Sequence, residues 1–484
     1  MNIEAVRTAY PDMVIPNVGS YYSSHIARWK NIFENNPPWK TVKRGGLYKK
    51  GSRQMNRLNV AKVLCDCFSD LTFSEQCEIT IDDAAYQEFI NKQLEDNGFW
   101  ENMPETVSMG YALGGCTVKV YAENAKPRIN YVHANHFLPI EWTGKQITSG
   151  AFTTVAHRNG NFYTLVEMQN KGRVEYKLFR STTMDSLGSP CALSELYNFG
   201  DSADYKADCP MFAYFKPCTS NNVEYDTPLG MSIYANSIDT LKALDVAFDS
   251  FAREFILGKK RIIVPSSAIQ TVVDTKTGEL VRYFDADDEA FVALKADDAD
   301  QMKVQDNTVE LRVEEHVAAI NALLNILCFQ VGLSAGTLSF DAVQGLKTAT
   351  EVISQDSKTA RTIKSNKNLL TETIETVIHA LIAVGVYLGL IPQTEYTVTI
   401  GWKDNVIIDD NTLIENNIKL VQAGLKSKLR AIMEVQKCDE ATAQAELDRI
   451  AKEQAVTGLA VDDFLRGGEG DDKTGDDAAQ SGAE

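Results

Sequence analysis

The sequence lacks the segments that mark membrane and exported proteins. No apolar run approaches the roughly 18 residues needed to span a bilayer, and the N-terminus MNIEAVRTAYPDM has no hydrophobic signal core. The nine cysteines are an odd number and include no CxxC pair, which favours free thiols in a reducing compartment over a disulfide framework. We therefore expect a soluble protein that stays on the side of the membrane where it is made.

The sequence also has little of the chemistry that an enzyme needs. The segment GLSAG at 332–336 fits the GxSxG pattern of serine hydrolases, but we expect a helix before it, and His379 is the only histidine after it. Residues 46–52 have the glycines of a phosphate-binding loop but no lysine before Ser52. We therefore expect no catalytic residue and no ATP hydrolysis.

Candidate metal ligands are equally sparse. His133 and His136 are three residues apart, a spacing that does not bring both side chains to one metal on a strand or loop, and Cys65 and Cys67 form an isolated CxC. A structural role for all four is the better interpretation, and we expect neither a metal nor a cofactor. The net charge of −18 argues against a protein that coats nucleic acid by general basicity.

Two stretches with heptad-like apolar seams stand out. The first predicts one helix from Thr227 to Gly258 with Pro228 in its first turn, and the second predicts a helix that ends at Gly332. The seams are Leu241, Leu244, Phe248, Phe251 and Phe255 in the first helix, and Val313, Val317, Ile320, Leu324, Leu327 and Val331 in the second. Such narrow stripes pack on another helix, so we expect the two helices to form a stalk.

The residues between these helices, 259–306, predict a small strand-rich lobe. β-branched runs at Arg261–Val264, Thr271–Val273 and Val292–Leu294 predict strands, and Thr277–Gly278 predicts a turn. Residues 274–306 contain ten acids and four bases. The acids that could form a docking surface are Asp285, Asp287, Asp288, Glu289, Asp297 and Asp298. An ordinary solvated acidic face remains an equal alternative.

A long helix is expected from about Lys347 to Gly389, because Pro392 prevents its continuation. Residues 342–370 contain five bases and two acids, a local excess of positive charge in an acidic protein. Lys358, Arg361 and Lys364 step by three along one side of this helix, where they could touch phosphates without reading sequence. The alternative is a solvated or salt-bridged face.

The remaining parts of the chain predict a mixed α/β body, a basic block and a helical C-terminal region. The expected elements are a helix at Asp83–Leu113, strands at Thr117–Tyr121, Ala151–Val155, Phe162–Met168 and Val174–Phe179, tight turns at Asn159–Gly160 and Lys171–Gly172, and a strand at Tyr396–Trp402 that returns to the same sheet. Residues 28–62 hold ten bases and one acid, interleaved with aromatic residues. They predict either a phosphate-contacting arm or a loop that pairs with acidic neighbours in an oligomer.

Residues 412–463 predict further helices. Residues 467–484 contain six acids and no large apolar side chain. We expect this segment to be disordered, because it cannot bury enough apolar surface to offset the entropy of ordering.

The order of helix, acidic β-lobe, helix, glycine-containing loop and long helix resembles the core of tailed-bacteriophage portal proteins. The Leu229–Gly230 start, the Gly258–Arg261 exit and the Gly332–Ser334 loop look like the subgroup from long-tailed phages of Gram-positive bacteria.

The resemblance implies a mixed α+β multidomain portal fold that assembles as a ring. Its parts would be an α/β wing at 1–226, stem helix 1 at 227–258, a small β-rich clip at 259–306, stem helix 2 at 307–331, a tunnel loop at 332–346, a long helix with the returning wing strand at 347–410, a helical crown at 411–466 and a disordered acidic tail at 467–484.

The resemblance further implies a non-enzymatic dodecameric ring at one capsid vertex of the virion, assembled in the host cytoplasm, through which double-stranded DNA is packaged and ejected. Implied partners are the terminase large subunit, which performs the ATP hydrolysis, head-completion or adaptor proteins, and the major capsid and scaffolding proteins, with no membrane partner. The clip acids would be the docking surface. The implied DNA-channel residues are Leu333, Ser334, Thr337, Ser339 and Gln344 of the tunnel loop, with the bases Lys347, Lys358, Arg361 and Lys364.

Two alternatives stay open. The first is a hydrolase or nuclease with a long helical insertion that uses the serine of GLSAG or scattered acids. The second is a ring-forming head or tail protein without a DNA channel.

Overall fold

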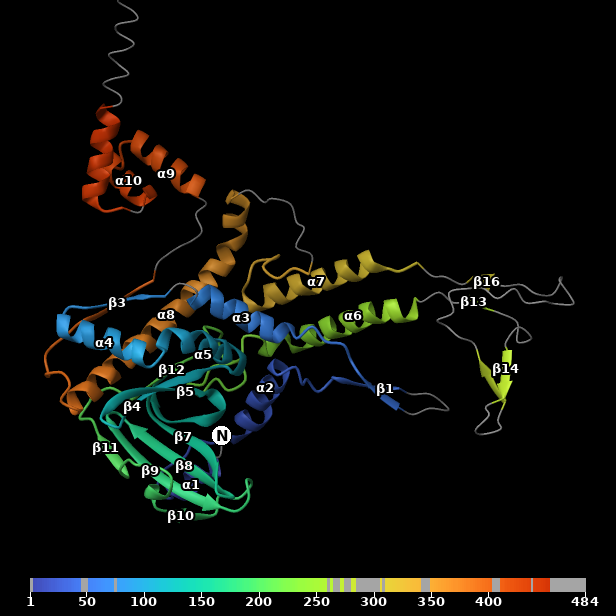
Figure 1. The fold of residues 1–484 in the computed structure, drawn as a ribbon, viewed down its shortest axis with the longest axis horizontal. Coiled ribbons are helices and arrows are strands. Elements are labelled where there is room, and N and C mark those ends of the chain that lie inside the picture. The colour runs from blue at the N-terminus through green and yellow to red at the C-terminus, as the bar shows by residue number, and fades with distance from the viewer. Residues whose placement is uncertain are drawn as a thin grey trace, which may run out of the picture. The chain divides into compact units, whose positions relative to one another are not determined.

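The computed structural model describes residues 3–44, 51–73, 76–258, 262–263, 270–273, 280–283, 305–306, 310–340, 349–402, 410–436 and 438–452. It comprises two compact units, which we describe separately (Figure 1). The first unit contains Met1–Leu346 and Val352–Lys403, and the second contains Lys347–Glu351 and Asp404–Glu484.

An antiparallel meander forms the largest sheet of the first unit. Its strand order is β10-β9-β8-β7-β6, and β11 also pairs with β9. Asn159, Gly160 and Lys171 have φ of 51°, 75° and 47°, the left-handed conformation that tight hairpin turns need. The predicted meander and both of its turns are confirmed. The bounds are β6 (Phe137–Thr143), β7 (Gln146–Arg158), β8 (Asn161–Asn170), β9 (Arg173–Ser181), β10 (Ser189–Cys191) and β11 (Ser202–Asp204).

A second sheet, in the order β12-β4-β5, packs against helix α5. The single helix expected over Asp83–Leu113 is wrong: Gly98 takes the left-handed conformation at φ 58° and separates two helices. Asp83 caps the first of them by accepting hydrogen bonds from the backbone N–H groups of Ala85 and Tyr86 at 2.8 and 3.1 Å. The bounds are α3 (Val60–Phe73), α4 (Ala84–Asp96), α5 (Phe99–Leu113), β4 (Cys116–Glu123), β5 (Lys126–His133) and β12 (Phe212–Phe215), with short 3₁₀ turns η2 (Ala134–His136) and η3 (Leu193–Glu195).

The long helix is confirmed as α8 (Ala349–Tyr387, 39 residues). Its part Lys358–Tyr387 is long and apolar enough to cross a membrane by length and composition, so the expectation that no segment approaches this is wrong. The side chains explain the composition, because Leu370, Ile374 and Leu381 are all 0% exposed. A helix that is buried inside a large core meets the same criteria. The two sheets together with α3, α4, α5 and α8 are called the body below.

The strand expected at Tyr396–Trp402 exists as β17 (Val398–Gly401), but it does not join the meander. It pairs antiparallel with β3 (Glu78–Ile81), which lies between α3 and α4 in the chain. Two hydrogen bonds hold the segment that follows α8 beside β3. The Tyr86 hydroxyl donates to the Pro392 carbonyl at 2.6 Å, and the Thr397 N–H donates to the Asp82 carboxylate at 2.9 Å. The prediction of a return to the meander was therefore wrong.

Two antiparallel helices, α6 (Ile238–Leu257) and α7 (Val313–Val331), pack against each other as their seams predict. We call this pair the stem. Thr240 donates to the Gln330 amide at one end, and Arg312 binds Glu254 through two hydrogen bonds of 3.0 Å at the other. Gly332 ends α7 with φ 87°, as expected.

The first stem helix begins at Ile238, after the 3₁₀ turn η4 (Ala235–Ser237), and not at Thr227. Residues 229–234 instead cross the body, where their backbone groups bond to distant tyrosines. The carbonyl of Gly230 accepts from the Tyr21 hydroxyl at 2.6 Å, and the Ile233 N–H donates to the Tyr111 carbonyl at 3.1 Å. A Cβ atom on Gly230 would lie 2.2 Å from the carbonyl oxygen of Gly114. These tertiary contacts override the helical pattern.

The lobe between the stem helices is described only in four short strands. β13 (Ile262–Ile263) pairs with β16 (Gln305–Asp306), and β14 (Gln270–Val273) pairs with β15 (Leu280–Tyr283), all antiparallel. Strands at the first two predicted runs are thereby confirmed. The turn at 277–278, the run at 292–294 and all six candidate docking acids lie outside the described residues.

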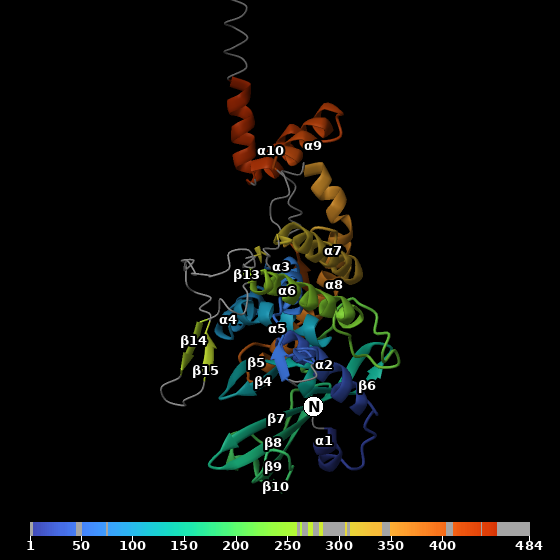
Figure 2. The same cartoon turned by 90° about the vertical axis from the view of Figure 1, so that its right-hand side faces the viewer.

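The N-terminal residues cover two different regions. α1 (Ile3–Ala9) lies beside the meander strands, as Figure 2 shows. After the π-helix η1 (Tyr21–Ile26) and α2 (Ala27–Phe33), the hairpin β1 (Thr41–Arg44) and β2 (Gly51–Gln54) extends along the stem. The described residues 39–44 and 51–58 are called the arm below.

The second unit is helical in its described residues, in agreement with the predicted C-terminal helices. It contains α9 (Asp410–Gln422), α10 (Lys428–Gln436) and a further helical stretch at 440–452. The acidic tail at 467–484 lies outside the described residues.

Candidate functional site

The loop that joins α7 to α8 begins with two buried residues. Leu333 is 1% exposed and Ser334 is 6% exposed. The Ser334 N–H donates to the Thr359 hydroxyl of α8 at 2.8 Å, and the Thr359 hydroxyl donates to the Ser334 hydroxyl at 3.1 Å. Leu333 and Ser334 therefore anchor the loop on α8. Their burial in the protomer does not favour the expectation that these two side chains line a DNA channel, which stays a prediction.

The same geometry bears on a serine nucleophile. A nucleophile elbow holds its serine exposed on a strand-to-helix turn beside a histidine. Here Ser334 is buried after a helix, and its hydroxyl bonds to Thr359. His379 instead bonds to the Tyr396 hydroxyl at 2.7 Å. The arrangement secures a loop and does not resemble a catalytic triad.

The next part of the loop is held on α7 by two asparagines. The Gly336 N–H donates to the Asn325 amide oxygen and the Phe340 N–H donates to the Asn321 amide oxygen, each at 2.8 Å. Thr337 is half-buried and donates to the Ser334 carbonyl, whereas Ser339 is exposed. The remaining loop candidates, Gln344 and Lys347, lie outside the described residues.

The three bases on α8 differ in their surroundings. The Lys358 ammonium donates to the Phe329 carbonyl at 2.8 Å and lies 4.4 Å from the centre of the Phe329 ring. Lys358 thus ties α8 to α7. Arg361 and Lys364 are both exposed. Of this set, Lys364 is the exposed base that we carry forward, because Arg361 has other interactions in the structure.

The basic block at 28–62 is fixed by two acids of α6 that were not predicted from the sequence. Asp249 is 5% exposed and forms a bidentate ion pair with Arg53, and it also accepts from the Asn56 N–H at 3.1 Å. The Arg53 guanidinium holds the pKa of the Asp249 carboxyl below its usual value. The arm is therefore bonded to the stem through a buried charge pair.

Asp245, one turn earlier, makes the second attachment. It is 7% exposed and accepts from the Trp39 indole N–H at 2.8 Å and the Leu58 N–H at 3.2 Å. Burial raises the pKa of the Asp245 carboxyl. Two acids spaced four residues apart beside an apolar seam are the sequence signal of these attachments.

Metal ligands and disulfides do not form a site in the part of the chain that is described. The described residues contain no group of three or more His, Cys, Asp or Glu side chains that could hold a metal. His136 is near the Thr153 carbonyl at 3.2 Å, and burial lowers the pKa of His133 and of His136. All nine cysteines are described, and each is a free thiol.

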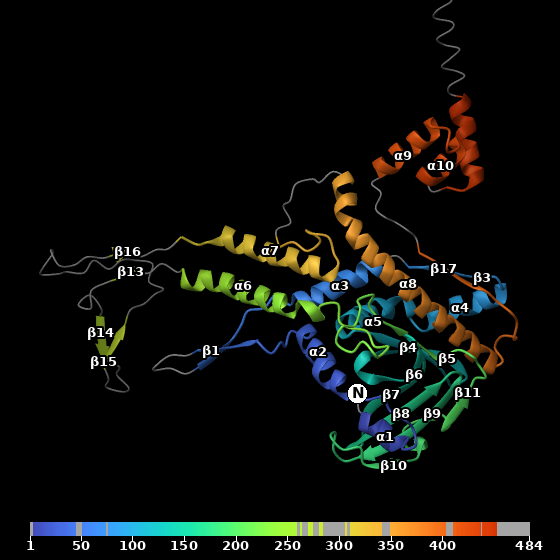
Figure 3. The same ribbon diagram turned by 180° about the vertical axis from the view of Figure 1, so that it is seen from behind.

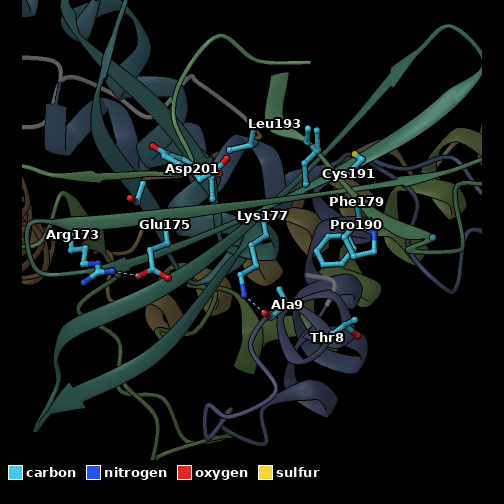
Figure 4. Close-up of a pocket in the computed structure, with 15 residues that line it drawn as sticks. Thr8, Ala9, Arg173, Glu175, Lys177, Phe179, Pro190, Cys191, Leu193 and Asp201 are labelled. Atoms are coloured by element: carbon cyan, nitrogen blue, oxygen red, sulfur yellow. Dashed lines mark hydrogen bonds and ion pairs between the residues drawn. The ribbon is translucent and has the colours of Figure 1, made fainter. Parts of the chain in front are cut away.

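An open cavity of about 720 Å³ lies between α1 and strands β9 and β10 (Figure 4). Three of its charged side chains have partners within the protein: Arg173 binds Glu175 at 2.8 Å, and the Lys177 ammonium donates to the Ala9 carbonyl. The Lys177 ammonium also lies 4.1 Å from the Tyr10 ring centre. These contacts hold α1 on the sheet.

Comparison with protein families decides the identity. The model of the family described as phage portal protein, SPP1 Gp6-like, matches residues 16–457. The chain belongs to this phage portal family. Portal proteins of this kind are structural proteins of the phage virion with a head-to-tail connector role, and the family is not an enzyme family.

Two further comparisons accompany the family match. No curated protein matches this portal protein. Among solved structures, a chain of the "Virion of native gene transfer agent (GTA) particle" is similar at 10% sequence identity and a TM-score of 0.39, with 78% of this chain and 88% of that chain covered.

Proposed function

We propose that this portal protein forms a dodecameric ring at one capsid vertex and that double-stranded DNA passes through the ring during packaging and ejection. The match to a portal family over residues 16–457 is the observation that carries the proposal. We assign the chain to the subgroup from long-tailed phages of Gram-positive bacteria. The ring is assembled in the host cytoplasm.

The proposed domains follow the element order. Residues 1–226 form the wing, α6 and α7 form the stem, residues 259–306 form the clip and residues 411–466 form the crown. The antiparallel stem, which continues at its far end into the paired strands β13 and β16, supports this division. The first stem helix is the part that begins at Ile238.

The DNA-facing surface is assigned to the exposed part of the tunnel loop and to α8. Thr337, Ser339 and Lys364 are the described residues of this surface, and Gln344 and Lys347 continue it. A single ammonium such as that of Lys364 binds phosphate without reading bases, as a sliding duplex requires.

The proposed partners bind at two places, the clip and the body. The acidic clip docks the terminase large subunit during packaging and head-completion or adaptor proteins afterwards. Acidic residues at a docking surface favour basic partners and accelerate their association. The body contacts major capsid and scaffolding proteins.

Negative-stain electron microscopy of the purified full chain tests the proposed function. We expect class averages of rings with a central hole wide enough for a DNA duplex. Rings without such a hole would support a head or tail protein without a channel. Monomers or compact dimers at all concentrations would contradict the proposal, and hydrolase activity that Ser334→Ala abolishes would replace it.

A titration with a DNA duplex at several salt concentrations tests the channel residues. Lys364→Gln should weaken DNA binding. It should also reduce the magnitude of the slope of log affinity against log salt by about 1 or more, because fewer counterions are released from the DNA when a phosphate contact is lost. Lys92→Gln, at an exposed position of α4, is the matched control. Equal slopes for the two variants would remove Lys364 from the channel surface.

A further inference from the structure

Helix α6 is the middle of three layers, between the arm and α7. On α6, Thr240 and Glu254 contact α7, whereas Asp245 and Asp249 hold the arm. At 3.6 residues per turn, Asp245 and Asp249 lie about 140° and 180° around the helix from Thr240. The arm and α7 therefore lie on opposite sides of α6, as Figure 3 also shows.

The hairpin of the arm has one face on α6 and one face to solvent. Val42 pairs with Arg53, whose side chain reaches Asp249, and both residues are half-buried. Side chains alternate along a strand, so the neighbouring pairs point the other way. These outward residues are Thr41, Lys43, Ser52 and Gln54, and all four are exposed.

The side of α7 that faces away from α6 is exposed at the start of the helix, whereas Asn321 and Asn325 further along the same side hold the loop at 336–340. His316 faces Glu254 of α6 at 3.7 Å. Glu314 and Ala318 stand two residues on either side of it, about 160° around the helix, and both are exposed. The two surfaces have opposite charge: α7 contains glutamates but no lysine or arginine, whereas residues 39–58 contain seven bases and no acid.

We propose that these two flanks bind each other between neighbouring copies of this chain, so that the outward face of the hairpin lies on α7 of the next subunit, with Lys43 opposite Glu314. The inference rests on the proposed ring. Rotation about a ring axis places opposite flanks of adjacent copies against each other, and repeated heterologous contacts of this kind close a ring. A two-stranded hairpin is marginally stable alone, and a second copy provides the surface that covers it.

The heights along the stem agree with this pairing. From Trp39 at Asp245 to Arg53 at Asp249, the arm runs toward the far end of α6. Lys43 lies one strand residue beyond that level, about 3 Å, and Glu314 lies at the level of Glu254, about 7.5 Å further than Asp249. When the stems run along the ring axis, rotation preserves these heights. The remaining difference of about 4 Å is within reach of the two side chains.

Charge exchange in the full-length protein tests the contact. The arm variant is Lys43→Glu with Gln54→Glu, and the flank variant is Glu314→Lys with Ala318→Lys. Each alone places like charges in every contact and should raise the protein concentration for half-maximal ring assembly by about tenfold or more. A 1:1 mixture of the two variants forms alternating rings in which every contact again joins opposite charges. Assembly of the mixture should therefore return to about the wild-type concentration.

Sedimentation velocity and negative-stain images provide the readout, with circular dichroism to verify folding. Lys43→Arg and Glu314→Asp preserve charge and should assemble as the wild type does. Normal assembly of both reversed variants, or a mixture that stays unassembled, would overturn the proposed contact. If the wild-type protein still formed rings, the proposed function would be unaffected. An arm variant that assembles normally but loses affinity for duplex DNA would also overturn it. Absence of wild-type rings would overturn both inferences.

Discussion

The body and the stem differ in how completely one protomer buries its apolar side chains. In the body, Tyr111, Phe137 and Phe152 are at most 1% exposed. Along α6 the exposure of the seam rises from 0% at Leu244 to 45% at Phe255. The body thus buries these large apolar side chains within one protomer, whereas the far half of the stem exposes apolar surface that the protomer does not cover. Exposed apolar area of this kind is typical of an assembly surface.

The largest expected effect concerns a charge pair inside the body. Lys119 donates to Glu167, which also accepts from the Gln169 amide, and the pair links β4 to β8 at 8% and 4% side-chain exposure. Glu167→Gln leaves the ammonium without a counter-charge and should lower the free energy of unfolding by about 3–5 kcal/mol. Urea denaturation of the body measures this loss.

Two controls sharpen this prediction. Lys119→Met combined with Glu167→Gln removes the orphaned charge and should recover most of the stability. Glu195→Gln breaks the Arg180–Glu195 pair, whose side chains are 51% and 33% exposed, and should cost less than about 1 kcal/mol. Equal losses for the buried and the exposed pair would refute the distinction.

Elements with local signals were predicted well from the sequence. The meander follows from strand alternation and from turn pairs such as Asn159–Gly160, and α8 follows from its period. The partner of β17 and the start of α6 at Ile238 were not predicted, because long-range contacts to Asp82 and Tyr21 determine them. Local periodicity has no information about such contacts.

The candidate site was predicted only in outline. The loop after Gly332 exists, but the burial of Leu333 and Ser334 depends on Thr359, which lies 25 residues beyond Ser334 in α8. Likewise, the sequence pattern around Asp245 and Asp249 does not indicate that they contact an arm about 200 residues earlier in the chain. Charge composition left two alternatives for the basic block, a phosphate-contacting arm or a loop that pairs with acidic neighbours in an oligomer, and it did not identify α6.

A matched pair of alanine substitutions along α6 tests the difference between body and stem directly. Leu244→Ala removes a fully buried side chain and should destabilise the protomer by about 2–4 kcal/mol. Phe255→Ala, at a residue 45% exposed, should cost the protomer less than about 1.5 kcal/mol but should reduce ring assembly. Urea denaturation and sedimentation velocity separate the two effects. If Phe255→Ala assembled normally, the far stem would not be an assembly surface.

The smallest expected effect is a pH dependence at the far end of the stem. Arg312 bonds to Glu254 and, with a smaller contribution from the charge of nearby His316, lowers the pKa of the Glu254 carboxyl from 4.5 to about 2. Because the folded-state pKa lies below the unfolded one, the stabilisation is complete above about pH 4.5 and disappears as the pH falls toward 2. Glu254→Gln should flatten this part of the stability curve, measured by urea denaturation between pH 5.5 and 2.5. Lys119 and Glu167 of the body are unchanged in this variant. If its stability depended on pH as that of the wild type does, the Arg312–Glu254 pair would contribute nothing to folding, and the far stem would gain its order from neighbouring subunits.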